Sequence, residues 1–146
     1  MQITQTILDH FKFEEGYRLN VYKDSLGNYT IGIGHLLGTN HANVGLVWTD
    51  QQVMEQFQDD VDVADAEIRN IFHEYDRFSS GLQLGLLDMS FQLGNRLTGF
   101  HNTIQLIHAG KFADAANSAL QSAWARETPH RAQRTTQLIR TGSYVN

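Results

Sequence analysis

Apolar residues recur at intervals of three or four over most of the chain, which is the spacing of amphipathic helices. The longest such run covers about residues 50–70, and its apolar positions share one face: Val53, Phe57, Val61, Ala64 and Ile68. Thr49 precedes the run and Gln52 follows three residues later, as in a capping box. This pattern predicts one long helix with a single apolar stripe.

Helical patterns also occupy both ends of the chain. Residues 1–13 place their apolar side chains on one face of a short helix. From Ser80 onward the spacing is helical, and Ser80 with Gln83 forms a second capping-box pattern. Thr128 followed by Pro129 is typical of a helix start. We therefore expect the C-terminal half to consist of several helices.

The segment between the first helix and the long helix has the pattern of a strand pair. Apolar side chains at Tyr29, Ile31 and Ile33 alternate with small or polar ones. Leu26-Gly27-Asn28 is a turn candidate, so a β-hairpin is expected, and residues 38–47 are predicted to form a loop. The predicted fold class is α+β, mostly α. A small lobe with a hairpin is joined by the long helix to a helical lobe, and a polymer is expected to lie in a cleft between them.

Composition limits the classes of protein to consider. With 146 residues, 41% hydrophobic and 18% charged, the chain resembles one globular domain. It has no cysteine, which excludes disulfides, and its seven histidines lack a common ligand spacing, so no metal site is predicted. The first 13 residues lack the pattern of a secretory signal, and no apolar run reaches the length of a membrane span. We expect synthesis in a cytoplasm without membrane insertion.

Two carboxylates and a hydroxyl, Glu15, Asp24 and Thr30, flank the predicted hairpin. Paired carboxylates that face one another are the minimal equipment for acid-catalysed cleavage of a glycosidic bond. Glu15 would be the general acid, and Asp24 with Thr30 would position a water molecule. In the alternative interpretation, Glu15 is a surface residue beside Glu14 and Asp24 only caps the hairpin turn.

The same residues belong to a longer motif. Eight residues separate Glu15 from Asp24, and five separate Asp24 from Thr30. The motif also includes the flanking stretches Tyr22-Lys23-Asp24 and Thr30-Ile31-Gly32-Ile33-Gly34-His35. This motif resembles that of the phage-type lysozymes of glycoside hydrolase family 24, most closely those of T-even phages. Two later stretches resemble the same enzymes: Phe91-Gln92-Leu93-Gly94 and Trp124 to Arg134. The resemblance covers nearly the whole chain.

The resemblance implies a lysozyme-like fold and a muramidase. The enzyme would cut the β-1,4 bond between N-acetylmuramic acid and N-acetylglucosamine without a cofactor. Hydrolysis would invert the anomeric centre, which requires about 6.5–9.5 Å between the two carboxyl groups. The resemblance implies a single lysozyme domain with two lobes. One lobe covers about residues 14–60, and the other combines residues 1–13 with residues 70–146. The resemblance implies four substrate-binding residues, Leu36, Phe91, Thr103 and Ser118. It also implies three supporting residues, Arg131, His35 and Asp60.

Some of these residues have roles that the resemblance specifies further. Arg131 is expected near Glu15, and His35 is expected to pair with Asp60 and tie the hairpin to the long helix. Asp88 stands where T-even enzymes carry Asn, and a further carboxylate near Glu15 would raise the pKa of that acid. Gly32-Ile33-Gly34 lacks the third glycine of a dinucleotide fingerprint, so we expect it to let a sugar approach the strand.

The charge is distributed unevenly. Residues 1–88 contain 14 Asp or Glu and 5 Lys or Arg residues. Residues 89–146 contain 2 Asp or Glu and 6 Lys or Arg residues. In one interpretation the acidic part serves solubility alone. In the other, the basic part holds the acidic peptides of peptidoglycan. Nucleic acid is not an expected partner, because the chain is acidic overall, at −5, and lacks a recognised binding module.

Two alternative functions remain beside hydrolysis. A lytic transglycosylase needs the acid but no carboxylate to activate water, and the presence of Asp24 argues against it. A catalytically silent peptidoglycan-binding module would be expected if Glu15 or Asp24 were missing. For the muramidase we expect a monomer that stays in the host cytoplasm until release, with a holin as the usual means, and then acts on the cell wall or periplasm.

Overall fold

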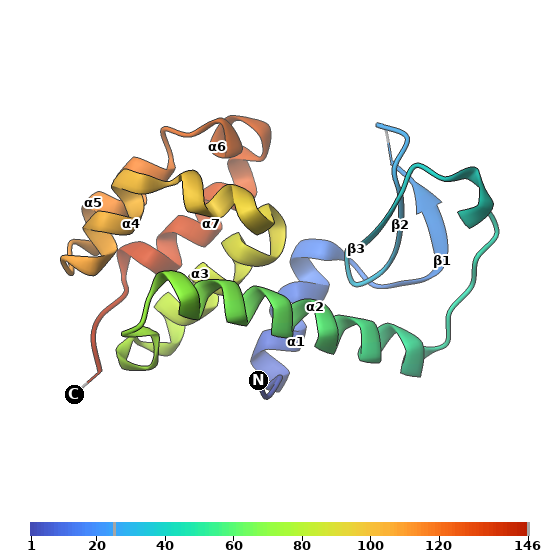
Figure 1. The fold of residues 1–146 in the computed structure, drawn as a ribbon, viewed down its shortest axis with the longest axis horizontal. Helices are drawn as coiled ribbons and strands as arrows, with labels where there is room; N and C mark the ends of the chain where they lie inside the picture. Colours follow the sequence, from blue (N-terminus) through green and yellow to red (C-terminus); the bar gives the residue numbers. More distant parts are fainter. Residues whose placement is uncertain (25, 146) are drawn as a thin grey trace. The chain divides into compact units, whose positions relative to one another are not determined.

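The computed structural model describes residues 1–24 and 26–145 (Figure 1). The chain forms two compact units, of which the first is Met1–Asp62 and the second runs from Val63 to the C-terminus. The α+β, mostly α fold class is confirmed, because one small sheet lies near the N-terminus and the remainder is helical. The grouping of residues 1–13 with 70–146 stays a prediction.

The first unit contains a helix, α1 (Gln5–Glu15), and a sheet of three antiparallel strands in the order β1 (Arg18–Lys23), β2 (Tyr29–Gly32) and β3 (His35–Gly38). The prediction of a hairpin alone was therefore incomplete, because it missed the third strand. Gly32 and Gly34 have φ angles of +67° and +66°. These left-handed conformations turn the chain back after β2, so the alternating pattern does not continue as one strand.

After the sheet, a short 3-10 turn (His41–Asn43) leads to α2 (Asp50–Ile71). The predicted capping box is confirmed: the Thr49 amide donates to Gln52 Oε1 at 2.9 Å, and the Gln52 amide donates to Thr49 Oγ1 at 3.2 Å. The predicted apolar stripe is also confirmed, since each of its five members is at most 2% exposed. The stripe contributes to the cores of both units, because α2 continues past Asp62.

The second unit continues from α2 with a series of helices. In chain order they are η2 (Tyr75–Arg77), α3 (Ser80–Leu93), η3 (Gly94–Gly99), α4 (His101–His108), α5 (Phe112–Ala119), α6 (Ala123–Glu127) and α7 (Pro129–Arg140). The capping box at Ser80 was wrong by one residue, because Ser79 holds the extended backbone of an N-cap and accepts from the Leu82 amide at 3.4 Å. The start of α7 at Pro129 is as predicted.

Two helices of the second unit, α3 and α7, pack closely against one another (Figure 1). At Gly85 of α3, a Cβ atom would lie 3.1 Å from Leu138 Cβ and 3.2 Å from the Thr135 carbonyl oxygen of α7. The missing side chain therefore lets the two backbones approach. This approach brings polar groups of the two helices within hydrogen-bonding distance. Among the described residues, no helix is both long and apolar enough to cross a membrane.

The capping box at the start of α2 gives a test of the fold. Thr49→Ala removes the hydroxyl that accepts from the Gln52 amide, so we expect the free energy of unfolding to fall by about 1 kcal/mol. Thr49→Ser keeps that hydroxyl and is expected to stay within a few tenths of a kcal/mol of the native value. Urea denaturation measures both, and equal stabilities for the two variants would contradict a capping role.

Candidate active site

Glu15 is the last residue of α1, and the structure holds this end of the helix firmly. Phe11, one turn earlier, is fully buried, and the centroid of its ring lies 5.6 Å from the ring centroid of Phe57 in α2. Gly16 ends the helix with a φ of +79°, and its amide donates to the Lys12 carbonyl at 2.9 Å. The half-buried Glu15 side chain is thus attached to an anchored backbone.

Gly34, between β2 and β3, lies directly against the side chain of Glu15. A Cβ atom at Gly34 would be 2.8 Å from Glu15 Cδ and 2.9 Å from Glu15 Cβ, closer than real Cβ atoms come to other atoms. Glu15 itself occupies the space where a side chain of residue 34 would be, and the approach of a sugar to Gly32-Ile33-Gly34 stays a prediction. Gly34 sets the position of the predicted acid, a role that a positive-φ glycine beside a catalytic candidate could have signalled.

Asp24 follows β1 and holds the turn that leads to β2. Its Oδ1 accepts from the amides of Leu26 and Asn28, each at 2.9 Å, so the turn-capping interpretation is realised in the structure. Within residues 1–24 and 26–145, no donor is bonded to Oδ2. The two amides fix the carboxylate in one orientation, and a role for Oδ2 toward water stays a prediction.

The strand register places further candidates on one face of the sheet. Thr30 of β2 is paired with Tyr22 of β1 on one side and with Leu36 of β3 on the other. Residues paired across strands share a face, and so do residues two apart along a strand, which brings Asp24 near the same row. Leu36 is 59% exposed. An exposed apolar side chain beside Thr30 is suited to contact a sugar ring.

His35 and Asp60 lie in contact within the first unit. His35 Nδ1 is 2.8 Å from Asp60 Oδ2, while Asp60 Oδ1 accepts from Gln56 at 3.0 Å. The His35 ring also lies 5.8 Å from the ring of Trp48. The contact joins β3 to α2, as the resemblance implied, and gives these residues a structural task beside the site.

Thr103 and Ser118 come together in the second unit. Thr103 Oγ1 and Asn102 Nδ2 each donate to Ser118 Oγ at 3.0 Å, which joins α4 to α5. Both predicted residues line a pocket of about 320 Å³ that also includes Phe100 and Gln121. Thr103 is buried, whereas Ser118 is half-buried. Asn102, which was not predicted from the sequence, adds an amide donor to this cluster.

Arg131 of α7 forms an ion pair with Asp88 of α3 inside the second unit. The guanidinium donates to Asp88 Oδ1, and Thr135 Oγ1 donates to Asp88 Oδ2 at 2.7 Å. Asp88 is fully buried and Arg131 is 8% exposed. Asp88, which stands where T-even enzymes carry Asn, is therefore paired with the Arg131 guanidinium and hydrogen-bonded by the Thr135 hydroxyl. The closeness of Arg131 to Glu15, and the effect of Asp88 on Glu15, stay predictions.

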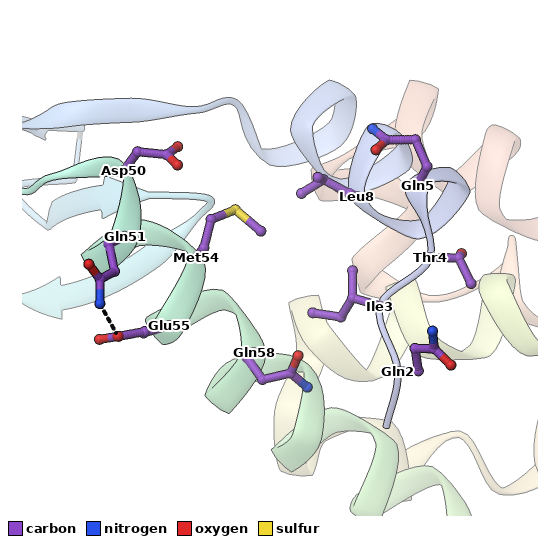
Figure 2. A pocket seen from close by; sticks show the side chains of 10 residues that line it. All are labelled: Gln2, Ile3, Thr4, Gln5, Leu8, Asp50, Gln51, Met54, Glu55 and Gln58. Carbon is purple, nitrogen blue, oxygen red and sulfur yellow. Dashed lines mark hydrogen bonds between the residues drawn. The ribbon is translucent and has the colours of Figure 1, made fainter.

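The predicted residues are thus distributed over both units. Phe91, the remaining substrate candidate, is half-buried in α3. In neither unit, considered by itself, do three His, Asp or Glu side chains of the described residues lie close enough together to bind one metal ion. A pocket of about 680 Å³ in the first unit is lined by none of the predicted residues (Figure 2). Leu8 and Met54 point toward one another across it, and glutamine side chains surround them.

Comparison with known proteins identifies the family. The model of the phage lysozyme family matches residues 12–140. The chain belongs to the phage lysozyme family. As a lysozyme it is a glycoside hydrolase, which agrees with the assignment made from the Glu15, Asp24 and Thr30 motif.

Curated relatives of this lysozyme include whole enzymes and parts of larger proteins. Probable T4-type lysozyme 1 of Dictyostelium discoideum is 28% identical over 165 aligned residues, which cover 97% of either chain. Peptidoglycan hydrolase gp36 of Pseudomonas phage phiKMV is 34% identical over 120 residues, which are 82% of this chain and 13% of gp36. Pre-baseplate central spike protein Gp5 of Enterobacteria phage T4 is 27% identical over 153 residues, with 27% of its length covered.

The contact between Gly34 and Glu15 predicts a specific defect. Gly34→Ala should lower activity about 100-fold or more, because the new methyl group displaces the Glu15 carboxyl. Gly38→Ala is the matched control: Gly38 also has a positive φ, +96°, but nothing within 4 Å of its Cβ position. Both variants should lose about 1–2 kcal/mol of stability from backbone strain. Equal activities of the two variants in a wall-clearing assay would contradict the positioning role.

The Asp88–Arg131 pair predicts a strong coupling. Arg131→Met removes the cation from the buried Asp88, so we expect a loss of about 3–5 kcal/mol in the free energy of unfolding. Adding Asp88→Asn removes the buried charge and should recover most of that loss. Urea denaturation of both single variants and the double variant measures the coupling. Additive losses would show that the ion pair contributes no specific interaction.

Proposed function

We propose that this phage lysozyme hydrolyses the β-1,4 bond between N-acetylmuramic acid and N-acetylglucosamine in bacterial peptidoglycan. The single observation that carries the proposal is the packing of Gly34 against Glu15, which fixes a carboxyl group beside the sheet that contains Thr30 and whose first strand is followed by Asp24. The name of the phiKMV relative, a peptidoglycan hydrolase, supports the substrate.

In the proposed mechanism Glu15 donates a proton to the oxygen of the leaving sugar, and the bond between that oxygen and the anomeric carbon breaks. Asp24 Oδ2 accepts a proton from the attacking water, while the Thr30 hydroxyl orients this water. The two amide donors to Asp24 Oδ1 hold the carboxylate in place. Attack from the face opposite the leaving group inverts the anomeric centre, so a β bond yields an α product.

The remaining residues would hold the glycan around this reaction. We propose that Leu36 contacts a sugar ring, and that Phe91, Thr103 and Ser118 contribute further contacts from the second unit. In cells the enzyme would act on the wall after release from the host cytoplasm with the aid of a holin.

The reaction is tested by analysing the products released from purified peptidoglycan. Native protein should release muropeptides with reducing-end muramic acid, initially as the α anomer by NMR. Glu15→Gln should lower the rate by about 10²–10⁴, because general acid catalysis contributes that much, and Asp24→Asn should be similarly impaired. Glu14→Gln, which changes the neighbouring carboxylate, is the matched control and should retain activity.

Each alternative has its own outcome in the same experiment. Anhydro-sugar ends with active Asp24→Asn would assign the chain to the lytic transglycosylases and leave Asp24 with its turn-capping role alone. Binding to peptidoglycan without any released product would favour the silent binding module. A β-anomeric first product would replace inversion with retention.

A further inference from the structure

The proposed acid and the proposed base belong to different elements of the first unit. Glu15 is the last residue of α1, whereas Asp24 follows β1. Gly16, which directly follows Glu15, has a φ of +79°, and a Cβ atom at this position would have nothing within 4 Å. Because glycine is the least restricted residue, its own torsion angles do not fix the direction in which the chain leaves α1. Other contacts must therefore set the position of Glu15 relative to Asp24.

Tyr17, the residue after this glycine, makes one such contact. Its hydroxyl donates to Asp50 Oδ1, and Asp50 lies in the first turn of α2 (Figure 2). The hydrogen bond to this carboxylate raises the pKa of Tyr17 above its ordinary value, so the phenol remains a donor at neutral pH. The bond is of a strong kind, because its acceptor is charged. The chain that leaves α1 is thus tied to the start of the long helix.

The ring of Tyr17 makes a further contact with α1. Lys12 Nζ lies 4.9 Å from the centroid of the ring, within the range of a cation–π interaction. Lys12 is one turn before Gly16, and its carbonyl accepts from the Gly16 amide at 2.9 Å. Tyr17 therefore contacts the last turn of α1 through its ring and the first turn of α2 through its hydroxyl.

Backbone and core contacts complete the connection between these elements. Helix α1 packs on α2 through the aromatic pair described above. The Leu19 carbonyl in β1 accepts from the Trp48 amide, just before α2, at 2.8 Å. This second tie is four residues from Glu15, whereas Tyr17 is two residues from it. The Tyr17 hydroxyl thus holds the chain closer to the proposed acid than the backbone bond does.

We propose that Tyr17 is a positioning residue, and that its hydrogen bond to Asp50 holds the Glu15 carboxyl at the separation from Asp24 that inversion requires. The proposal rests on the proposed function, since it takes Glu15 as the acid and Asp24 as the base. A separation of about 6.5–9.5 Å leaves room for the attacking water. A rotation at Gly16 changes that separation, and small displacements of reacting groups slow a reaction strongly. In this role Tyr17 acts only through Glu15.

Steady-state hydrolysis of soluble, uncross-linked peptidoglycan strands tests this role. Tyr17→Phe retains the ring and its contact with Lys12 but removes the hydroxyl donor. Asp50→Ala removes the acceptor, whereas Asp50→Asn retains an acceptor oxygen. The matched control is Tyr29→Phe, which removes a tyrosine hydroxyl of the same unit that lies 3.2 Å from His41 Nδ1. Thermal unfolding of each variant shows whether it is folded at the assay temperature.

We expect Tyr17→Phe and Asp50→Ala each to lower kcat about tenfold with KM unchanged, because the acid is displaced while the substrate contacts stay in place. Removing both partners should cost no more than removing one, since the two changes interrupt a single bond. Asp50→Asn and the control Tyr29→Phe should both keep most of the native kcat. A loss of stability alone would not separate kcat from KM in this way.

Four results would overturn the proposal. These are a native kcat in Tyr17→Phe, an equal loss in Tyr29→Phe, a rise in KM in place of the fall in kcat, or losses that multiply when Tyr17→Phe and Asp50→Ala are combined. Missing hydrolysis by the native chain would overturn the proposed function and the positioning role together. An active native chain with an equally active Tyr17→Phe would overturn the positioning role alone, so the two failures are distinguished.

Discussion

Five apolar side chains on one face of α2 contribute to the cores of both units. Val53, Phe57 and Val61 are buried in the first unit, whereas Ala64 and Ile68 are buried in the second. Because all five belong to one continuous helix, a rotation that exposed one set would expose the other. The Thr49–Gln52 capping box fixes where this helix begins.

The site in the first unit depends on a close contact at Glu15. Glu15 is fixed from two sides, by the anchored last turn of α1 and by the backbone at Gly34. A general acid is effective only when its carboxyl group is held within hydrogen-bonding reach of the leaving oxygen. Rigid neighbours supply this orientation before substrate arrives. The strain of a positive φ at Gly34 is avoided because glycine adopts it readily.

Polar residues have structural tasks in both units, and one of them, Asp24, also has a place in the proposed reaction. Asp24 holds the β1–β2 turn through one oxygen, and the other is left for the proposed contact with water. In the second unit, Asp88 and Arg131 satisfy one another within the closely packed pair of α3 and α7. A buried charge is tolerated only with such a partner.

The sequence by itself determined the features that depend on local spacing. The long helix, its capping box, its apolar stripe and the turn at Gly27 all follow from residues within a few positions of one another. The Glu15, Asp24 and Thr30 motif was equally visible, and with it the lysozyme family. The off-by-one cap at Ser79 shows the limit of this approach, since neighbouring serines have the same propensity and backbone conformation distinguishes them.

Only the tertiary structure decided the features that join distant residues. The third strand, the packing of Gly34 against Glu15 and the pairing of Asp88 with Arg131 each link segments whose separation in sequence carries no periodic signal. Asp88 in particular looked like an unmatched carboxylate, and its partner lies 43 residues away. Packing brings such groups together because burial requires every polar atom to find a partner, and the sequence does not state which one.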